Sequence, residues 1–525
     1  MKRTIPFAMI LGFIVAIYGC KESSQYEVEM NSETVSKTFD EQHRPQFHFS
    51  PPQQWMNDPN GMVFYDDEYH LFYQHYPDSN VWGPMHWGHA VSSDMVNWEH
   101  LPIGLYPDEL GYIFSGSAVV DWNNTSGFGS GTEPPLVAIY TYHEPVRAKD
   151  QERVDIQYQG IAYSLDKGRT WTKYEGNPVL DSPGIRDFRD PKVMWYEEGK
   201  KWIMTLAVKD KISFYSSPDL KSWSFESDFG EGLGGHGGVW ECPDLFKLPV
   251  TGADDEKWVL LVSINPGGPA GGSATQYFVG EFDGSTFSLD PSFAPEVIPV
   301  DGEEQAVWID YGPDNYAGVT WSDIPESDGR RLFIGWMSNW KYAQVVPTTV
   351  WRSAMTIPRE LRLHERAGSY RLSSKPVDEM QGIMDQPVDV FSEIQSELVL
   401  EDSLFALDLG GENLEGMQLT LSNNAGEFVS ITLNNDHVLF DRSQSGITDF
   451  EESFAGSHSA PLEDLIPERV QVFVDLSSIE VFVNDGAVVM TELVFPIRPY
   501  NKISLEGNID SAMMRTVSGI WNTKM

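Results

Sequence analysis

The sequence predicts an all-β protein in which a β-propeller is followed by a β-sandwich. Between residues 44 and 365, apolar and polar side chains alternate in short runs, such as 69–75 and 202–208, and Gly, Asn, Asp or Pro ends each run. Long runs with the 3.6-residue period of a helix are absent from this region. A turn segment also recurs in it about every 50 to 70 residues, as expected for one copy in each blade.

This recurring segment combines a strand end, a turn that begins with Asp, and an aromatic residue that starts the return strand. Its copies are 93–98, 164–171, 217–223 and, more weakly, 282–287. The Asp carboxylate can accept hydrogen bonds from its own turn backbone, and the aromatic ring can cover the end of the hairpin. We therefore expect these Asp residues to be structural rather than catalytic, in a propeller of four or five blades.

The first 43 residues resemble an export signal and a tether. An apolar run at 6–19 follows two basic residues and is too short for a membrane helix. It ends in a small residue followed by Cys20, which resembles a bacterial lipoprotein signal. This resemblance implies a signal peptide at 1–19 and lipidation of Cys20, with a flexible tether at 20–43. An ordinary signal peptide with an incidental Cys is the alternative.

After residue 365 the composition changes. A Ser-, Pro- and charge-rich stretch at 366–390 predicts a linker or an interdomain helix, and 391–525 predicts a β-sandwich. Alternating strands are expected at 397–401, 418–422, 428–433, 438–441, 469–475, 479–484 and 488–493. Asn484-Asp485-Gly486, between the last two, is typical of a tight hairpin.

The charge of the chain excludes some classes of partner. It carries 78 acidic and 36 basic side chains, a formal net charge of −42. Few cationic groups are available to replace the counterions of a phosphate backbone, so nucleic acid is not an expected partner. Anionic substrates and anionic membrane surfaces are disfavoured for the same reason. A neutral polysaccharide fits this charge, although the solubility of an exported protein explains it equally well.

Three short segments place carboxylates among aromatic and turn-forming residues. They are Trp55-Met56-Asn57-Asp58-Pro59-Asn60-Gly61, Arg189-Asp190-Pro191 and Trp240-Glu241-Cys242-Pro243-Asp244. Hydrolysis of a glycosidic bond needs one carboxylate that attacks the sugar and one carboxylic acid that protonates the leaving oxygen. In this order and wording, the segments resemble the signature of glycoside hydrolase family 32, the fructan hydrolases and invertases.

The resemblance covers nearly the whole mature chain. The stretch from Val472 to Gly486 resembles the C-terminal module of the same family. The family fold implies a five-bladed β-propeller catalytic domain, here at 44–365, followed by the C-terminal β-sandwich.

Asp58 and Glu241 are the two candidates for covalent catalysis. The neighbours of Asp58 end a turn and leave its side chain projecting, and the resemblance makes Asp58 the nucleophile. Glu241 stands in partly apolar company, which favours the neutral form that a general acid needs. The resemblance makes it the acid in glycosylation and the base in hydrolysis. An Asx-turn Asp and a salt-bridged strand Glu are the respective alternatives.

Asp190 is the third candidate catalytic carboxylate. It follows Arg189, so we expect its charge to be partly compensated and the carboxylate to stay ionised. The resemblance implies that Asp190 stabilises the transition state by bonding sugar hydroxyls and does not attack. A structural Arg–Asp pair is the alternative. Cys242 is expected to be a buried neighbour rather than a nucleophile, because no His is paired with its thiol.

Several residues around these carboxylates are candidate sugar contacts. They are Trp55, Met56, Asn57, Gln74, Trp82, Phe114, Ser115, Arg189 and one of Trp336 and Trp340. The resemblance implies that Gln74 binds a hydroxyl, that Trp82 forms an apolar wall, and that the Phe114-Ser115 segment bears pocket contacts. Packing in the core is the alternative for any one of them.

No metal or cofactor is expected. His86 and His89 are spaced like a metal pair, but no Cys or third His completes a ligand pattern. The Gly-rich runs at 234–238 and 267–272 lack the Gly-Lys-Ser/Thr of a phosphate loop. We interpret them as loops that shape the rim of a pocket.

These observations lead to one hypothesis and three alternatives. The hypothesis is an exported, lipid-anchored retaining β-fructosidase that acts on terminal fructosyl units of levan or inulin, fructo-oligosaccharides and sucrose. The alternatives are an inverting propeller glycosidase acting on arabinan or xylan, a fructosyltransferase, and a catalytically inactive surface glycan-binding protein. Linkage preference, exo or endo action, oligomeric state and exposure to periplasm or medium stay open.

Overall fold

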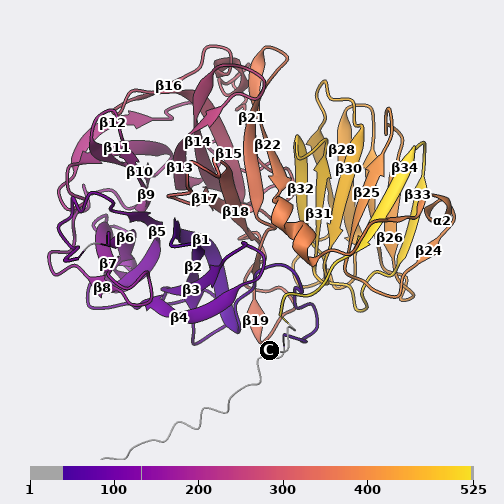
Figure 1. Ribbon diagram of the computed structural model, residues 1–525, viewed down its shortest axis with the longest axis horizontal. Coiled ribbons are helices and arrows are strands. Elements are labelled where there is room, and N and C mark those ends of the chain that lie inside the picture. The colour runs from indigo at the N-terminus through magenta and orange to yellow at the C-terminus, as the bar shows by residue number, and fades with distance from the viewer. Residues whose placement is uncertain (1–38, 132, 522–525) are drawn as a thin grey trace, which may run out of the picture. The chain divides into compact units, whose positions relative to one another are not determined.

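The computed structural model describes residues 39–131 and 133–521, and their regular secondary structure is almost entirely strands (Figure 1). The expected signal peptide, Cys20 and most of the tether lie outside the described residues. Among the residues described, no helix combines the length and the apolar character needed to cross a bilayer.

The first three blades are antiparallel sheets of four consecutive strands, in which each strand pairs with the next. The first contains β1 (Gln54–Tyr65), β2 (Glu68–Tyr76), β3 (His86–Ser92) and β4 (Glu99–Leu105). The second contains β5 (Tyr112–Val120), β6 (Leu136–His143), β7 (Gln157–Ser164) and β8 (Thr172–Lys173), with helix α1 (Pro145–Ala148) between β6 and β7. The third contains β9 (Phe188–Tyr196), β10 (Lys201–Val208), β11 (Lys211–Ser217) and β12 (Ser224–Phe229).

The last two blades follow the same order with small additions. The fourth contains β13 (Val239–Pro249), β14 (Glu256–Asn265), β15 (Ala274–Phe282) and β16 (Phe287–Leu289), followed by the 3₁₀ helix η1 (Ala294–Glu296). The fifth contains β17 (Tyr316–Thr320), β18 (Arg331–Met337), β21 (Arg359–Arg366) and β22 (Ser369–Pro376). Between β18 and β21, β19 (Trp351–Arg352) pairs with β1 and β20 (Ala354–Met355) pairs with β18.

The innermost strands bring the blades together. Contacts run from β1 to β5, β9, β13 and β17, and β17 contacts β1 again, so five blades of the described chain surround one centre (Figure 1). Strands β6, β10 and β14 are buried along almost their whole length rather than on alternate residues. The reason is that each blade is covered on both faces by its neighbours, which removes the solvent-facing row that alternation assumes.

The Asp residues of the recurring turn are structural, as predicted. The Asp94, Asp166, Asp219 and Asp283 carboxylates each accept hydrogen bonds from backbone N–H groups of their own turn, at 2.7–3.0 Å. The corresponding turn of the fifth blade, between β21 and β22, instead uses Gly368 at a φ of +77°. That turn has no Asp, which is why the repeat is visible in four blades only.

The predicted propeller boundary at residue 365 falls inside the fifth blade. Strand β22 pairs with β21 along its whole length, so the sheet continues to Pro376 through half of the predicted linker at 366–390. The rest of that stretch contains the 3₁₀ helix η2 (Asp378–Ile383) and the short strand β23 (Val388–Asp389). Polar composition suggested a linker because β22 is an outer strand with partly exposed side chains.

The C-terminal region is a sandwich of two six-stranded sheets in the described residues. One has the order β23-β34-β25-β30-β31-β32, where β25 is Phe405–Gly410, β30 Arg469–Val474, β31 Ser478–Val483, β32 Val488–Leu493 and β34 Ser511–Thr516. The other has the order β24-β33-β26-β27-β28-β29, where β24 is Leu398–Val399, β26 Gln418–Ser422, β27 Phe428–Leu433, β28 His437–Gln444, β29 Ser457–Pro461 and β33 Lys502–Glu506. Helix α2 (Phe391–Ile394) precedes β24. All strands expected in this region are present, and β25, β29, β33 and β34 were missed.

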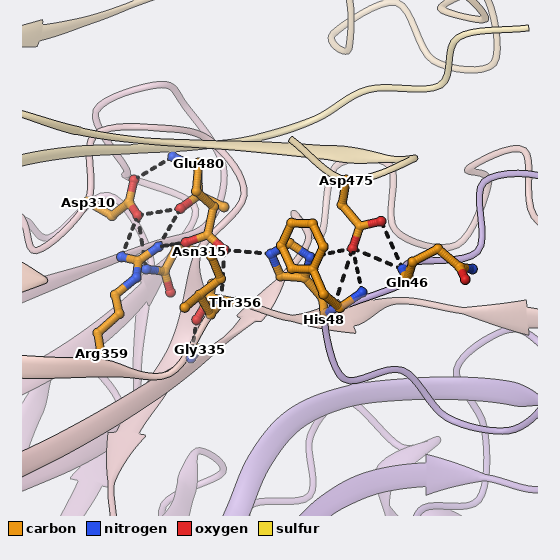
Figure 2. Close-up of polar contacts among 12 residues, drawn as sticks. Gln46, His48, Asp310, Asn315, Gly335, Thr356, Arg359, Asp475 and Glu480 are labelled. Atoms are coloured by element: carbon orange, nitrogen blue, oxygen red, sulfur yellow. Dashed lines mark hydrogen bonds and ion pairs between the residues drawn. The ribbon is translucent and has the colours of Figure 1, made fainter. Parts of the chain in front are cut away.

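One sheet of the sandwich packs against the propeller. Strands β31 and β32 are buried at every residue, although a sandwich strand normally exposes one face. Phe473, Phe482 and Val489 belong to the same core cluster as Trp55 and Trp336 of the propeller. Charged groups are buried here too, and Figure 2 shows those around Arg359 and Glu480.

Candidate active site

The innermost strand of every blade is bulged near its start. Each strand loses register with its neighbour over two residues, namely 57–58 in β1, 114–115 in β5, 190–191 in β9, 242–243 in β13 and 317–318 in β17. A bulge bends the strand and turns side chains away from the regular pleat. Asp190 and Cys242 stand in these bulges at φ values of +64° and +44°, in the left-handed region that few side chains adopt. The bulges of the first four blades thereby bring Asp58, Ser115, Asp190 and Cys242 into contact with one another.

The Asp58 carboxylate is held from several strands. Asn57 Nδ2 donates to Asp58 Oδ1 at 2.9 Å, and Ser115 Oγ of β5 donates to Oδ2 at 2.7 Å. The Cys242 thiol of β13 lies 3.6 Å from the same Oδ2. Trp55 Nε1 in turn donates to Asn57 Oδ1 at 2.6 Å and fixes the orientation of that amide. These bonds leave the carboxylate one orientation, as a nucleophile requires.

Asp190 is joined to the same group. Its Oδ2 accepts from the Cys242 backbone N–H at 3.1 Å and lies 3.6 Å from the Cys242 sulfur. Its own N–H donates to Thr141 Oγ1 at 3.0 Å. The sulfur of Cys242 therefore lies between the Asp58 and Asp190 carboxylates, and Glu241 is the preceding residue of β13. The structure thus brings together all three carboxylates singled out in the sequence.

Glu241 is bound by two polar side chains. Arg189 Nε and Nη2 reach Glu241 Oε1 at 2.9 and 2.8 Å, and the Tyr316 hydroxyl of β17 donates to Oε2. Arg189 also donates to Asp187 at 2.6 Å. The surroundings of Glu241 are therefore more polar than the sequence suggested. Arg189 is paired with Glu241 and Asp187 rather than with Asp190. About a fifth of the Glu241 side chain is exposed, 21%, so a ligand can reach it.

Burial and mutual repulsion set the charge of these groups. Burial raises the pKa of Asp58, and the Glu241 charge raises it further. Burial also raises the pKa of Asp190, against the lowering effect of Arg189, to about 7. Desolvation thus outweighs the neighbouring Arg189 charge in its effect on the Asp190 pKa, and the expectation that this carboxylate stays ionised remains a prediction. Burial and the surrounding carboxylates raise the pKa of the Cys242 thiol, so it remains neutral, as expected of a buried neighbour that is not a nucleophile.

The candidate sugar contacts divide into buried and accessible groups. Trp55, Met56 and Trp336 have no exposed surface. They belong to one core cluster, and in this conformation they have no surface that a ligand could contact. Trp340, partly exposed, stacks on Trp55 with ring centroids 5.8 Å apart, so Trp340 is the better placed of the two alternatives.

The remaining candidates lie around the carboxylates or at the rim. Asn57, Ser115 and Arg189 contact the carboxylates directly, as described above. Gln74 is 2% exposed, and its Nε2 is a buried donor without a protein acceptor. Trp82 is 38% exposed, and its ring meets Phe114 edge to face at 6.1 Å. Trp82 and Phe114 are therefore in contact, and the apolar wall expected of Trp82 and the pocket contacts expected of Phe114 stay predictions.

Some members of the site were not found in the sequence. Tyr316 and Asp187 contact Glu241 and Arg189, and Thr141 holds the backbone of Asp190. None of them stands in a segment with a recognisable motif. The signal that could have found Tyr316 is its position: it begins the innermost strand of the fifth blade, where the other four blades carry site residues.

Comparisons with known proteins agree with this geometry. The family described as Glycosyl hydrolases family 32 N-terminal domain matches residues 48–376, and its C-terminal counterpart matches 398–518. A levanase of Bacillus subtilis (strain 168) is 47% identical over 508 residues, covering 93% of this chain and 72% of the relative. An extracellular exo-inulinase of Aspergillus niger is 40% identical over 496 residues, covering 87% of this chain and 90% of the relative.

Solved structures extend the likeness to the fold. The exo-inulinase of Aspergillus awamori superposes with a TM-score of 0.83 at 36% identity, covering 92% of this chain and all of that chain, 100%. A β-fructofuranosidase of Schwanniomyces occidentalis complexed with fructosyl-erythritol gives a TM-score of 0.78 at 31% identity, covering 92% of this chain and 99% of that chain.

Proposed function

The chain belongs to the glycosyl hydrolases of family 32, and on that premise we propose that it is a retaining β-fructosidase. The substrates proposed are the terminal fructosyl units of levan and inulin, fructo-oligosaccharides and sucrose. The relatives named levanase, exo-inulinase and β-fructofuranosidase support this substrate class. The single observation that carries the proposal is the joining of Asp58, Asp190 and Glu241 around Cys242.

The proposed reaction has two steps. In the first, an Asp58 oxygen attacks the anomeric C2 of the fructosyl unit while the Glu241 carboxylic acid gives its proton to the leaving oxygen. This forms a covalent fructosyl ester and releases the shortened chain or glucose. In the second, the Glu241 carboxylate takes a proton from water, the water oxygen attacks C2, and the Asp58–C2 bond breaks. Configuration at C2 is retained because it is inverted twice.

The other residues position substrate and catalysts. Asp190 is proposed to bond ring hydroxyls, and these bonds strengthen as positive charge develops on the sugar. Arg189 and the Tyr316 hydroxyl hold Glu241 from opposite oxygens. Asn57, Ser115, Gln74 and Trp340 are proposed sugar contacts around the reacting unit. Trp82 and Phe114 are proposed to form the apolar wall.

Chromatography of early products tests the reaction and its substrate. Levan, inulin and sucrose are digested side by side, and the anomer first released is identified in a fresh digest. Fructose as the early product supports removal of terminal units, and the relative rates give the linkage preferred. Growth of longer oligosaccharides at high sucrose would indicate a transferase instead. An inverted product, or no release of sugar, would refute the proposal.

The catalytic roles predict large losses on substitution. Asp58→Ala and Glu241→Ala should each lower kcat on inulin and levan by about 10³-fold or more, because each removes a group that forms or breaks a bond. Circular dichroism and thermal melting should show the fold intact. Asp254→Ala, at an exposed Asp in the β13–β14 turn, is the control and should keep wild-type rates. Near-wild-type activity of Asp58→Ala would contradict the assignment.

We also propose that the protein is exported and anchored by a lipid on Cys20, with a signal peptide at 1–19 and a tether at 20–43. The extracellular relatives support export, and the sequence before Cys20 supports the anchor. Cys20→Ser should therefore move the enzyme from the membrane fraction to the soluble fraction while kcat stays unchanged. Fractionation followed by assay of both fractions checks this. Sedimentation of the variant with membranes would contradict the anchor.

A further inference from the structure

The β-sandwich supplies polar side chains that are buried against the propeller. Glu480 and Thr491, on β31 and β32, have no exposed surface. Thr491 donates from its backbone N and from Oγ1 to the two oxygens of Asp310, at 3.0 and 2.6 Å. Asp310 belongs to the propeller and lies in the segment before β17 (Figure 2). The carboxylate of Asp310 is therefore held by the other domain as well as by the Gly312 N–H of its own segment, at 3.0 Å.

Glu480 fixes the second charged group of this cluster. Arg359 Nη2 donates to Glu480 Oε2 at 2.5 Å and to Thr491 Oγ1 at 2.7 Å, and Nη1 donates to Asp310 Oδ2 at 2.9 Å. Glu480 Oε1 accepts from the Ile357 backbone N–H at 2.8 Å. Arg359 Nε has no partner among the described residues, so Nη1 and Nη2 carry all of these bonds. Paired buried charges resist displacement, because moving one of them leaves another without a partner at low dielectric. The cluster is thus a fixed frame that spans both domains.

Asp310 connects this frame to the active site. Asn315 Nδ2 donates to Asp310 Oδ2 at 3.1 Å. Asn315 has little room to move, since a Cβ on Gly335 would lie 2.0 Å from its Oδ1. The next residue is Tyr316, whose hydroxyl donates to Glu241. The path from the sandwich to the acid/base carboxyl therefore contains Asp310, Asn315 and Tyr316.

We propose that the β-sandwich positions the acid/base carboxyl Glu241 through this path. Thr491 and Asn315 are then positioning residues: they hold Asp310 and the start of β17, and β17 places the Tyr316 hydroxyl on Glu241. Tyr316 stays protonated because burial, and then the Glu241 charge, raise its pKa. This inference rests on the role of Glu241 in the proposed function.

The inference can be tested with two substrates that differ in how much they depend on a general acid. Sucrose has a poor leaving group that must be protonated, whereas an activated aryl β-fructofuranoside loses its aryloxide with little help. Asn315→Ala should lower kcat/KM on sucrose about tenfold more than on the aryl fructoside, since a misplaced acid affects the sucrose reaction alone. Thr491→Val keeps the backbone bond to Asp310. It should therefore lower the ratio of kcat/KM on sucrose to kcat/KM on the aryl fructoside as well, but by less.

A matched interface variant separates positioning from stability. Trp521→Phe removes another hydrogen bond between the domains, the one from Trp521 Nε1 to the Pro45 carbonyl oxygen at 2.9 Å, which is not part of the cluster around Asp310 and Glu480. It should lower the melting temperature and leave the ratio of the two rates unchanged. If Asn315→Ala does not fold, Glu480→Gln is measured by the same ratio.

The outcomes are distinct for the two proposals. Equal losses of kcat/KM on both substrates in the folded Asn315 and Thr491 variants would overturn the inference. It would also be overturned if Asn315→Ala changed the ratio of the two kcat/KM values and Thr491→Val did not. A wild-type enzyme that cleaves neither fructoside would refute the proposed function instead.

Discussion

At Asp190, three influences on one carboxyl can be separated. Burial raises its pKa, the Arg189 charge lowers it, and the Glu241 and Asp58 charges raise it again, to about 7 against an ordinary value of 3.8. Arg189 is less effective than its place in the sequence suggests because its guanidinium donates to Glu241 and Asp187. Burial is therefore the largest influence on the Asp190 pKa, and the Arg189 charge opposes it only in part.

Asp190→Asn should stabilise the protein at high pH. Between pH 3.8 and about 7 the folded state keeps a proton that the unfolded chain has released, so the wild type loses stability as pH rises through this window. Asn does not ionise and can still accept the bond from the Cys242 N–H. The variant should gain on the order of 1 kcal/mol or more in unfolding free energy at about pH 8, relative to wild type.

Urea unfolding at about pH 8 and about pH 3.5 checks this prediction. The gain in unfolding free energy should disappear at the lower pH, where Asp190 is mostly neutral in both the folded and the unfolded protein. Activity should be lost at every pH. A gain of the same size at both pH values would show that packing, and not charge, explains it. The trade of stability for activity is typical of buried catalytic groups.

At the scale of single residues, the sequence was most informative where a segment has a motif. Asp58, Asp190 and Glu241 stand in such segments, and the structure brings them together. Tyr316 was missed because its role depends on which strand the fifth blade places beside β13. The buried state of Trp55 and Trp336 was missed for a similar reason, since exposure is a property of the packed blades.

At the scale of elements, the bulges explain how a regular fold makes an irregular site. The five innermost strands would otherwise point alternate side chains into the neighbouring blades. A bulge at the same place in each strand redirects one or two residues per blade. The sequence shows only indirect signs of this, such as the Pro residues that follow Asp58, Asp190 and Cys242.

The turn Asp residues act on stability alone. Asp219 Oδ1 accepts from the Lys221 and Ser222 N–H groups at 3.0 and 2.8 Å, far along the third blade from the bulge in β9. Asp219→Ala should lower the unfolding free energy by about 1 kcal/mol, as the loss of a capping carboxylate typically does, and leave kcat and KM unchanged. Asp254→Ala, at an exposed turn Asp, is the matched control and should lower it by less than half as much.

Thermal and denaturant unfolding measure the change in unfolding free energy, and sucrose hydrolysis measures kcat and KM. A change in KM for Asp219→Ala would give this turn a functional role that its hydrogen bonds do not suggest. Such turns predicted four or five blades, and only the family resemblance implied five. Where the turn lacks Asp, in the fifth blade, the predicted boundary was placed eleven residues before the end of β22, at 365 rather than Pro376.

At the scale of the whole chain described, the two domains are joined by buried charge as well as by apolar packing. Composition and strand patterns predicted both domains, but they contain no information on which sheet of the sandwich faces the propeller. That choice is visible only in the structure, where Glu480 and Asp475 of the sandwich meet His48 of the propeller (Figure 2). Isolated in the sequence, each of these residues looks like an ordinary surface residue.

His48 gives this interface a dependence on pH. Its ring nitrogens lie 2.7 Å from Asp475 Oδ2 and 2.9 Å from Glu480 Oε1, and none of the three side chains is exposed. Burial alone would lower the pKa of His48, but the bonds and charges of the two carboxylates raise it to about 9 from an ordinary 6.5. His48 is therefore charged in the folded protein at neutral pH.

The stability that His48 contributes should be lost at alkaline pH. A raised His pKa means that the folded state binds the proton more tightly, so the contribution is complete below pH 6.5 and disappears as pH rises through about 9. The shift corresponds to about 3 kcal/mol of unfolding free energy. The difference in unfolding free energy between wild type and His48→Gln should therefore shrink by about this amount between pH 6 and pH 10. His437→Gln, at a ring with 44% of its side chain exposed, is the control for replacing His by Gln outside the interface. A difference between wild type and His48→Gln that is constant over this range would mean that the three groups hold the interface as neutral hydrogen-bond partners.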